Sequence, residues 1–515
     1  MKLAMSAAAQ LPSARWLWLP LAVLVLLPLL VVTIPPLHDY PFHLARAEAI
    51  AALLGQVDHG TPYRLGSFML PNEAMDVVTL GLTAILAPIQ AGRVFLGLVQ
   101  VLLLSGTVAL HYALHRRVSP WPLLAAFFLY NWIFLYGFTN YLFGVGVMLW
   151  AVAAWVATAE WRWVPRLAVA TQAALVLLFC HLVAFGLFAV VVGGLALHDA
   201  LTGRHDGFAA RLFLPGLPFL VGLVVFVVLS PTIEEARQPI AYAGWWGWKP
   251  LVAWRTLLSG QTVLDIATLG PVALLALVLL LRRRLGLAPP MLAPLLLLGA
   301  TFAVMPHALF GSAYGDARLP VAVLLVAIAS TDLRRMGGPA MLAWVVVLGV
   351  LLAGRSLATA RGWMATQEIF ARHMDAFATM PEGSVLWAAT AGPYPTLAYR
   401  NAAELAMWHP PLKHVASLAG VGRDIFVPAT WADPYKQPIA VPQHYRAAKQ
   451  LQGDNPFKTT SSASLAEVLA SIRRLREAAP QFLLLSYPAR LEGALPPGAT
   501  PVAAGPDFLL LRLDE

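Results

Sequence analysis

The sequence has few charged residues and almost no cysteine. Only 12% of its 515 residues are Asp, Glu, Lys or Arg, whereas 59% are hydrophobic. A soluble protein carries about 25% charged residues, so this composition excludes an ordinary soluble enzyme. The single cysteine, Cys180, lies in an apolar run, which excludes an intramolecular disulfide and any cysteine-based metal site.

Hydrophobic runs of about 18 residues or more recur along the first two thirds of the chain, and each predicts a transmembrane helix. We therefore expect a mainly α, polytopic membrane protein with about eleven spans. The apolar block 167–197 is longer than one span needs, and we expect two short helices that meet near His181. No small-residue cleavage site follows the first run, which favours an uncleaved span over a signal peptide. The other spans are expected at residues 16–34, 93–114, 120–137, 140–158, 213–230, 266–281, 290–305, 319–331 and 341–352.

The net charge of +9 does not indicate a nucleic-acid partner, because the basic residues separate the hydrophobic runs and form no single patch. Paired arginines mark the cytoplasmic loops if the N-terminus is cytoplasmic. Treating 167–197 as one span would place Arg204 and Arg211 outside, so the positive-inside rule supports the split. The bias of Arg over Lys, with much Ala, Leu, Gly and Pro, indicates a bacterial protein of the cytoplasmic (inner) membrane. The expected cytoplasmic pairs are Arg116/Arg117, Arg162/Arg166, Arg204/Arg211, Arg282 to Arg284 and Arg334/Arg335.

Two large external loops are expected within a transmembrane domain of residues 1–355. The first loop is residues 35–92, because its apolar stretch 76–89 is too short for a span and is expected to form a helix lying in the membrane interface. The second loop, residues 231–265, contains Trp245-Trp246-Gly247-Trp248-Lys249. Such a motif is typical of an interfacial anchor, with a sugar- or lipid-contacting platform as the alternative.

Residues 356–515 are expected to form a small periplasmic or extracellular α/β domain, because hydrophobicity drops there. A helix is predicted at 465–478, with Ser464 as its N-cap and Glu467 completing a capping box. Strands are predicted at 384–389, 482–486 and 508–513.

A polar motif follows directly on the first span, where the chain leaves the membrane. It contains His38, Asp39, His43 and Arg46. Charged groups are costly to hold at a lipid boundary, so they indicate a functional site. A helix that begins near Pro41 would place His43 and Arg46 on one face and Asp39 at its N-terminus. The structural alternative is that Asp39 is simply the N-cap of an interfacial helix.

The motif and the layout together resemble the GT-C superfamily of membrane glycosyltransferases. The motif is Asp39-Tyr40-Pro41-Phe42-His43-Leu44-Ala45-Arg46, and the layout is a large first loop with a helix inside it, many spans and an external C-terminal domain. The superfamily includes protein O-mannosyltransferases, aminoarabinose transferases and oligosaccharyltransferases. The resemblance covers residues 16–355. It implies a GT-C-like bundle and an inverting transferase that takes a sugar from a polyprenyl phosphate carrier.

The resemblance also implies roles for the motif. The loop aspartate of the superfamily acts as a general base, or binds a metal, beside the acceptor hydroxyl, and Asp39 matches that position. His43 would orient the acceptor or share the base role, while His38 and Arg46 would line the acceptor side. Many members carry an adjacent pair of acids where this chain has His38-Asp39. One carboxylate suffices for a base, so no metal ligand is assigned and a divalent metal cofactor is left open.

A cationic site for the donor phosphate is predicted in the late loop 307–320. Guanidinium is always charged and binds two oxygens at once, and superfamily members often place an arginine in such a loop, which Arg318 matches. The alternatives are a surface pair of Arg318 with Asp316 and a snorkelling side chain. His307 and Tyr314 are weaker substrate-binding candidates.

Histidines elsewhere are less informative. His181, at the expected break between two helices, is either a hydrogen-bonded structural residue or a substrate-binding one. His409 and His414 in the C-terminal domain have no carboxylate at matching spacing, so they predict no metal site.

We expect glycosyl transfer from a polyprenyl-phosphate-linked sugar donor to an unidentified glycan, lipid or protein acceptor on the outer face. Membrane lipids are the other expected partners. A transporter or flippase of lipid-linked glycans is the first alternative, but such proteins bury ionisable residues at mid-membrane, whereas here they gather at the external edge. A non-catalytic membrane scaffold is the second alternative, and the lone acid at Asp39 keeps it open.

Overall fold

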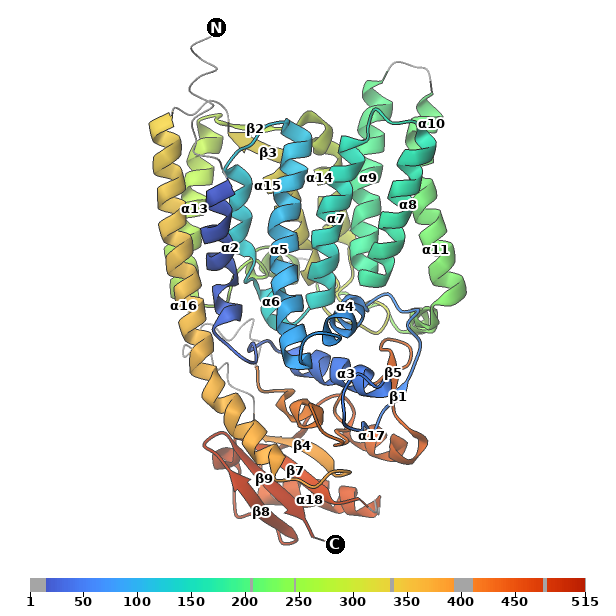
Figure 1. Cartoon of the computed structure of the whole chain (residues 1–515), viewed down its shortest axis with the longest axis vertical. Helices are drawn as coiled ribbons and strands as arrows, with labels where there is room; N and C mark the ends of the chain where they lie inside the picture. Colours follow the sequence, from blue (N-terminus) through green and yellow to red (C-terminus); the bar gives the residue numbers. More distant parts are fainter. Residues whose placement is uncertain are drawn as a thin grey trace.

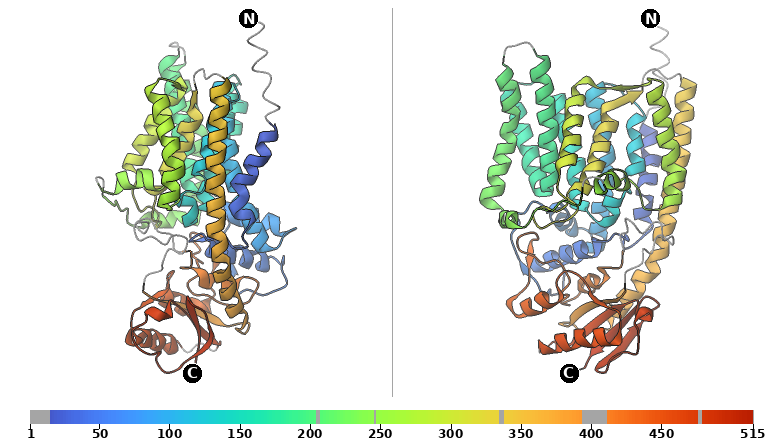
Figure 2. Two further views of the ribbon diagram at one scale, coloured as in Figure 1. Left: turned by 90° about the vertical axis from the view of Figure 1, so that its left-hand side faces the viewer. Right: turned by 180° about the vertical axis from the view of Figure 1, so that it is seen from behind.

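A helical bundle and a smaller C-terminal domain make up the computed structural model of the chain. Figure 1 shows the bundle standing above the C-terminal domain, with the N-terminus at the opposite end. In the two further views the domain again lies against one end of the bundle only (Figure 2). The structure describes residues 15–203, 207–244, 247–333, 338–392, 411–475 and 479–514.

Among these residues, seven helices are long and apolar enough to cross a membrane, which confirms a polytopic membrane protein. Shorter helices occupy the other expected spans, so each of the eleven predicted runs is helical. The long helices are α5 (Pro88–His115), α7 (Thr139–Ala157), α8 (Trp163–Cys180), α9 (Leu182–Thr202), α10 with α11 (Phe208–Phe213 and Leu217–Leu229), α13 (Thr262–Leu281) and α16 (Gly338–Ala378). The shorter ones are α2 (Arg15–Leu30), η1 (Trp121–Phe128) with α6 (Trp132–Tyr136), α14 (Leu292–Val304) and α15 (Leu319–Ser330).

The apolar block 167–197 forms two helices, as predicted. α8 and α9 flank His181, whose backbone is extended (φ −172°, ψ 128°). The ring Nδ1 of His181 accepts a hydrogen bond from the backbone N–H of Val183 (3.1 Å), so this residue is the N-cap of α9. The expectation of short helices is wrong: they have 18 and 21 residues, because both continue beyond the apolar block.

The described turns that contain the predicted arginines lie at one end of the bundle, away from the C-terminal domain. We call this end the arginine end. Arg116 is the C-cap of α5, Arg162 precedes α8 and Arg282 follows α13. Figure 1 shows these helix ends at one level. A small antiparallel pair, β2 (Leu285–Leu287) with β3 (Thr331–Leu333), lies there too. The predicted arginines outside the described residues are Arg204, Arg334 and Arg335.

The first large loop, residues 35–92, contains two helices rather than one. α3 (Tyr40–Leu53) has a proline in its first turn, where the missing N–H costs nothing, and 12 of its 14 residues are buried. The predicted helix 76–89 has the wrong bounds. α4 covers Ala74–Thr83, and Pro88 instead begins α5, because its fixed φ suits a first helical position.

The C-terminal domain is built on a five-stranded sheet in the order β6-β4-β7-β9-β8. β4 is parallel to both β6 and β7, whereas β9 is antiparallel to β7 and β8. All seven residues of β4 are buried, as expected of a central strand covered on both faces. The predicted strands are confirmed as β4, β7 and β9. The bounds are β4 (Val385–Ala391), β6 (Phe457–Thr459), β7 (Gln481–Ser486), β8 (Ala499–Ala504) and β9 (Phe508–Leu513).

The predicted helix 465–478 is α18 (Ser462–Arg474), and it begins earlier than expected. Ser461 is the N-cap: its hydroxyl accepts from the backbone N–H of Ser464 (3.2 Å), and the Ser464 hydroxyl accepts from that of Ser461 (3.1 Å). Ser464 is therefore the reciprocal partner in the capping box, not the cap. A second α-helix of the described part of this domain is α17 (Arg446–Gln452).

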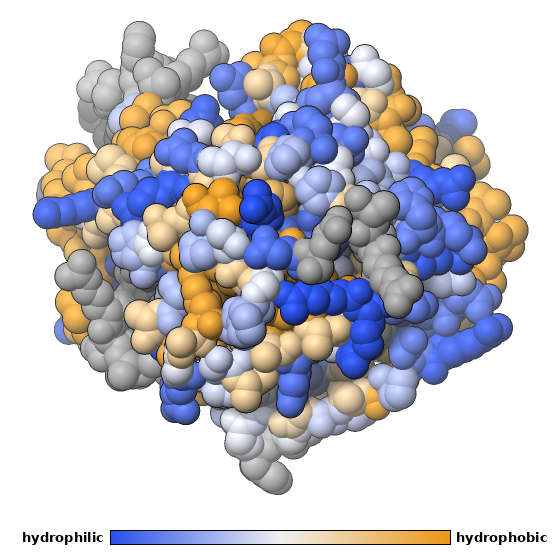
Figure 3. Space-filling view, turned by 90° about the horizontal axis from the view of Figure 1, so that it is seen from below, coloured by the Kyte–Doolittle hydropathy of each residue, from blue (hydrophilic) through white to orange (hydrophobic). Residues whose placement is uncertain are grey.

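The C-terminal domain contacts the bundle and its loops at several places in the described chain, and three of them bear on the site. α16 runs without a break through the expected boundary at residue 355 and into the domain (Figure 1). β1 (Arg64–Leu65) of the first loop pairs with β5 (Ile439–Ala440), and α3 packs against η7 (Val415–Gly420). The first loop is therefore enclosed between bundle and domain. On the outer face of the domain, hydrophilic residues are interspersed with hydrophobic ones (Figure 3), as in a surface exposed to water.

Candidate functional site

The backbone before α3 is fixed against the end of α6. The N–H groups of His38 and Asp39 donate to the carbonyls of Leu135 (3.0 Å) and Tyr136 (3.1 Å). Gly137 follows in a left-handed conformation (φ +103°), and a Cβ there would lie 2.8 Å from the Cβ of Asp39. Only glycine allows this close approach. The position of Asp39 is therefore set by two backbone hydrogen bonds and one glycine.

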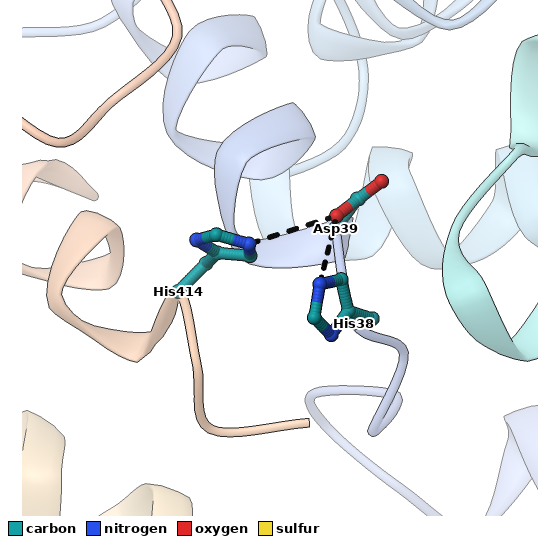
Figure 4. A group of neighbouring side chains, drawn as sticks. All are labelled: His38, Asp39 and His414. Carbon is teal, nitrogen blue, oxygen red and sulfur yellow. Dashed lines mark ion pairs between the residues drawn. The ribbon is translucent and has the colours of Figure 1, made fainter. Parts of the chain in front are cut away.

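Asp39 stands at the N-cap position of α3, yet its side chain makes no capping hydrogen bond. Only 3% of the residue is exposed. The carboxylate points instead toward two histidine rings, one from the preceding residue and one from the C-terminal domain (Figure 4). The simple N-cap alternative therefore has no hydrogen bond to support it.

His38 and His414 approach the same oxygen of Asp39. Their Nε2 atoms lie 3.5 and 3.8 Å from Oδ1, and the two rings meet edge to face with centroids 4.8 Å apart. Within the described part of the chain, neither Asp39 Oδ1 nor His414 Nδ1 has a hydrogen-bond partner. The cluster is buried and under-satisfied, which is costly for polar groups unless a further partner is present.

Burial controls the charge of this cluster. It raises the pKa of Asp39 to about 8, although the positive charges of Lys413 and Arg318 act in the opposite direction. Burial likewise holds the pKa of His414 well below its usual range, helped by His38 and Lys413. At neutral pH both groups therefore favour their uncharged forms unless a cation binds between them.

The cluster presents three metal-ligand atoms close together, although their spacing is wider than that around a bound ion. One ligand atom from each of His38, Asp39 and His414 lies within 4.8 Å of the others. Imidazole nitrogen and carboxylate oxygen bind zinc at about 2.0–2.2 Å, which places tetrahedral ligand atoms roughly 3.3–3.5 Å apart. The sequence could not reveal this set, because His414 lies far along the chain from the first loop.

A second buried cluster surrounds Arg46. Its guanidinium donates to both oxygens of Asp76 (2.7 and 2.9 Å) and lies 2.9 Å from His43 Nδ1. His43 and Arg46 thus share a helix face, as expected, but the guanidinium is already engaged by a carboxylate. Burial and the charge of Arg46 lower the pKa of His43 to about 3. This histidine is therefore neutral, with Nδ1 accepting from Arg46 and the other nitrogen donating to the Gly137 carbonyl.

Glu73 and Asp76 are further buried acids near Arg46, and the sequence analysis did not select them. Glu73 is 2% exposed, and burial together with the charge of Asp76 raises its pKa to about 8. Asn140 fixes this corner, because its side chain accepts from Met75 N–H (2.7 Å) and donates to the Asn72 carbonyl. An acid inside the otherwise apolar α4 was the available signal.

Arg318 lies in η5 (Asp316–Arg318), directly before α15, and faces the same region as Asp39. Its guanidinium stacks over Phe138 (4.6 Å) and donates to the Ala313 carbonyl (3.3 Å). Nε has no partner in the described chain. The charge of Arg318 is close enough to oppose the rise in the pKa of Asp39. A positive group with an open donor therefore stands near the buried carboxyl.

Asp316 is engaged by residues other than Arg318. Its Oδ2 lies 3.0 Å from Lys249 Nζ and accepts from Trp248 Nε1 (3.0 Å), while His307 Nδ1 is 3.4 Å from Oδ1. Trp248 and Lys249 both belong to α12 (Trp248–Arg255). The expected Asp316–Arg318 surface pair is not among the described ion pairs. Trp245 and Trp246 lie outside the described residues.

Aromatic rings connect the first loop with the late loop. Tyr136 lies 4.4 Å from His38 and 5.2 Å from Tyr314, and Tyr314 lies 5.1 Å from His307 (ring centroids). Three predicted residues, His38, Tyr314 and His307, thus belong to one continuous row of packed rings, with Tyr136 as the link between the two loops. His181 is further along: its ring packs 5.3 Å from Tyr141, whose hydroxyl donates to the Arg318 carbonyl (2.8 Å).

Comparison with known proteins identifies the fold. No protein-family model matches the chain, and no curated protein matches its sequence. Among solved structures, the chain is similar to ArnT from Cupriavidus metallidurans bound to undecaprenyl phosphate. The TM-score is 0.51 at 13% sequence identity, over 97% of this chain and 98% of that one. The chain therefore shares the overall fold of that ArnT structure, which agrees with the kind of fold that the resemblance in its sequence implies.

Proposed function

We propose that the protein is a membrane glycosyltransferase that uses a polyprenyl-phosphate-linked sugar. The observation that carries this proposal is that a buried carboxyl, Asp39, and a partly unsatisfied guanidinium, Arg318, face one region at the end of the bundle nearest the C-terminal domain. The structure of ArnT with bound undecaprenyl phosphate, which shares this fold, supports a lipid-phosphate carrier.

Asp39 acts as the general base in the proposed reaction. Its carboxylate takes the proton of the acceptor hydroxyl while that oxygen bonds to the anomeric carbon and the bond from this carbon to the phosphate oxygen breaks. The electron pair of the broken bond leaves with the polyprenyl phosphate. Attack on the face opposite the phosphate inverts the anomeric centre. A pKa of about 8 suits a base near neutral pH, because it balances proton affinity against the ionised fraction.

Arg318 binds the phosphate and stabilises the negative charge that develops on it. Its stacking on Phe138 and its bond to Ala313 fix the guanidinium plane, and Nε is left to donate to a phosphate oxygen. His307 and Tyr314, whose rings are in contact, line the donor side next to Arg318. His181 packs on Tyr141, which in turn is bonded to the Arg318 backbone, so it supports this arginine.

His43 and Arg46 position the acceptor side rather than move protons. Both ring nitrogens of His43 already have partners, and Arg46 is bound to Asp76. Their network keeps α3, and so Asp39, in place. A divalent ion held by His38, Asp39 and His414 would add positive charge beside the acceptor oxygen.

We further propose that the C-terminal domain faces the periplasm of a bacterium and that the N-terminus is cytoplasmic. The separation of the arginine end from the C-terminal domain supports this orientation under the positive-inside rule (Figure 1). The proposed chemistry then takes place on the outer face of the inner membrane.

The test is transfer by the purified full-length chain. Protein in lipid vesicles is mixed with polyprenyl-phosphate-linked sugars and a bacterial envelope extract as the source of acceptor. Release of free polyprenyl phosphate and incorporation of labelled sugar are measured by mass spectrometry. Wild-type protein is expected to release the carrier, and Asp39→Asn to lose about 100-fold or more of this activity. Asp454→Asn, at an exposed carboxylate of the C-terminal domain, is the matched control. Full activity in Asp39→Asn, or movement of the intact donor across the bilayer without transfer, would overturn the proposal.

A further inference from the structure

The C-terminal domain contributes a residue to the Asp39 site. His414 lies just before η7, and its ring packs 4.0 Å from Phe42 of α3 and 6.1 Å from Trp431 (ring centroids). The ring is 4% exposed and its Nε2 is directed at Asp39 (Figure 4). A residue of the C-terminal domain thus reaches the start of the first loop, beneath the membrane bundle.

The three side chains bring together a set of atoms that are common metal ligands. Two imidazole nitrogens lie 3.5 and 3.8 Å from one carboxylate oxygen, which is longer than an ordinary hydrogen bond. These separations are close to the spacing of ligands around one tetrahedral ion. Two nitrogens and one oxygen suit zinc and similar transition metals rather than magnesium, which prefers oxygen ligands.

The surroundings hold the ligands in place. His38 packs against Tyr136 (4.4 Å), and its backbone N–H is bonded to Leu135 (3.0 Å). The packing of His38 on Tyr136 and of His414 on Phe42 therefore limits how far the two rings can turn. Lys413 and Arg318 influence the charge of Asp39 from a distance, but neither forms an ion pair with it within the described chain.

We propose that His38, Asp39 and His414 bind one zinc-like divalent ion, and that this ion fastens the C-terminal domain to the first loop. Two ligands come from the entry to α3 and the third from the C-terminal domain, so the ion stabilises the contact between α3 and η7. This inference does not depend on glycosyl transfer, since a bound ion would dock the two parts whatever the reaction.

The first experiment measures metal content. The full-length chain, purified in detergent without chelator, is analysed by inductively coupled plasma mass spectrometry. Wild-type protein is expected to carry about one zinc per chain, and His414→Phe, which keeps a ring against Phe42 but has no ligand atom, to carry almost none. His414→Asp restores a ligand atom and should retain part of the metal. His444→Ala, at an exposed histidine of the same domain, is the control and should match wild type.

The second experiment measures docking of the domain. Chelation is expected to lower the melting temperature of wild-type protein by several degrees. It should also speed protease cleavage within the first loop and within the C-terminal domain, because the two would no longer be held together. In His414→Phe the chelator should change neither. Metal-free wild-type protein, or unchanged zinc in His414→Phe that elutes as a folded monodisperse species, would overturn the proposal. If wild-type protein carries zinc but shows no transfer, that result would count against the catalytic proposal alone.

Discussion

The two ends of the bundle each bury an aspartate beside a histidine, yet the two acids have opposite characters. Asp332, at the arginine end, is 4% exposed and Asp39 is 3% exposed. Asp332 accepts from Arg117, from Ser119 (3.0 Å) and from the backbone N–H of Leu333 (2.7 Å), with His111 at 3.7 Å. Asp39 has no described hydrogen-bond donor on Oδ1. Equal exposure of the two residues therefore does not mean equal charge.

The difference lies in the donors and in how deeply each carboxyl is enclosed. Burial alone would raise the pKa of Asp332, but the hydrogen bond from Arg117 and the nearby His111 bring it below its usual value. Asp332 also lines a cavity of about 550 Å³. Burial without such donors raises the pKa of Asp39 to about 8. One acid is a satisfied structural ion and the other is available to a proton, a cation or a substrate.

The largest expected effect separates these two acids by substitution to asparagine. Asp39→Asn removes the base and one proposed metal ligand. It should lower transfer by about 100- to 10,000-fold, with a fall in melting temperature no larger than chelation causes in wild type. Asp332→Asn removes the charge that Arg117 needs and should cost about 1–3 kcal/mol of stability while folded protein keeps its transfer activity. Activity per folded molecule and thermal unfolding are measured for both. Equal loss of activity in the two variants would end the distinction.

Arg318 gives the next effect. Arg318→Ala should lower transfer by about 10- to 100-fold, since one charge-assisted contact to phosphate is worth about 1.5–3 kcal/mol. Arg318→Lys should recover only part of this, because an ammonium cannot fork to two oxygens or stack on Phe138 in the same way. Binding of polyprenyl phosphate is measured by native mass spectrometry. Arg117→Lys, at the arginine end, should bind the carrier as wild type does.

The third prediction is a pH profile. In chelated protein, transfer should rise about tenfold per pH unit up to about pH 8, where Asp39 becomes ionised, and level off above. The native state of this metal-free protein retains a proton that the unfolded chain releases near pH 4. Its free energy of unfolding should therefore fall between about pH 4 and pH 8 and then stay flat. Asp39→Asn should lack this component. A transfer rate of the chelated wild-type protein that is independent of pH from 6 to 8 would contradict the assignment.

The smallest effect concerns Gly137. A Cβ at this position would meet Asp39 Cβ at 2.8 Å and Asp39 N at 2.9 Å, and the backbone has φ +103°. Gly137→Ala should cost about 1–3 kcal/mol of stability and also reduce transfer by displacing Asp39. Gly383→Ala is the matched control, because Gly383 has φ +75° with no heavy atom within 4 Å of a Cβ. If Gly137→Ala behaves like Gly383→Ala, Gly137 does not position Asp39.

The membrane architecture could be predicted because it depends on local properties. Long apolar runs gave the helices, and the arginine pairs located the break at His181 against the simpler reading of one span. Helix ends were less certain where two residues compete for one role. Ser461 and Ser464 share a capping box, and Pro88 suits the start of α5 better than the end of another helix.

Site residues could be predicted where a segment carries its own signal, as in the first-loop motif and in the late loop with Arg318. His38, Asp39, His43 and Arg46 are close in sequence and lie together in the structure. Asp76 and His414 could not be selected, because their partners are brought near by the packing of α4 and η7 on α3. A periodic pattern describes what faces a core, but not which distant carboxyl or imidazole completes a pair.

The length of α16 has a mechanical consequence. Its 41 residues make a rod about 60 Å long, at 1.5 Å per residue, whereas the hydrocarbon layer is about 30 Å thick. Half of the rod therefore projects beyond the lipid and carries the C-terminal sheet (Figure 1). A tilt of only 5° would move its far end by about 5 Å over that length. The contacts of α3 with η7 and of β1 with β5 therefore have to resist such a tilt if His414 is to stay beside Asp39.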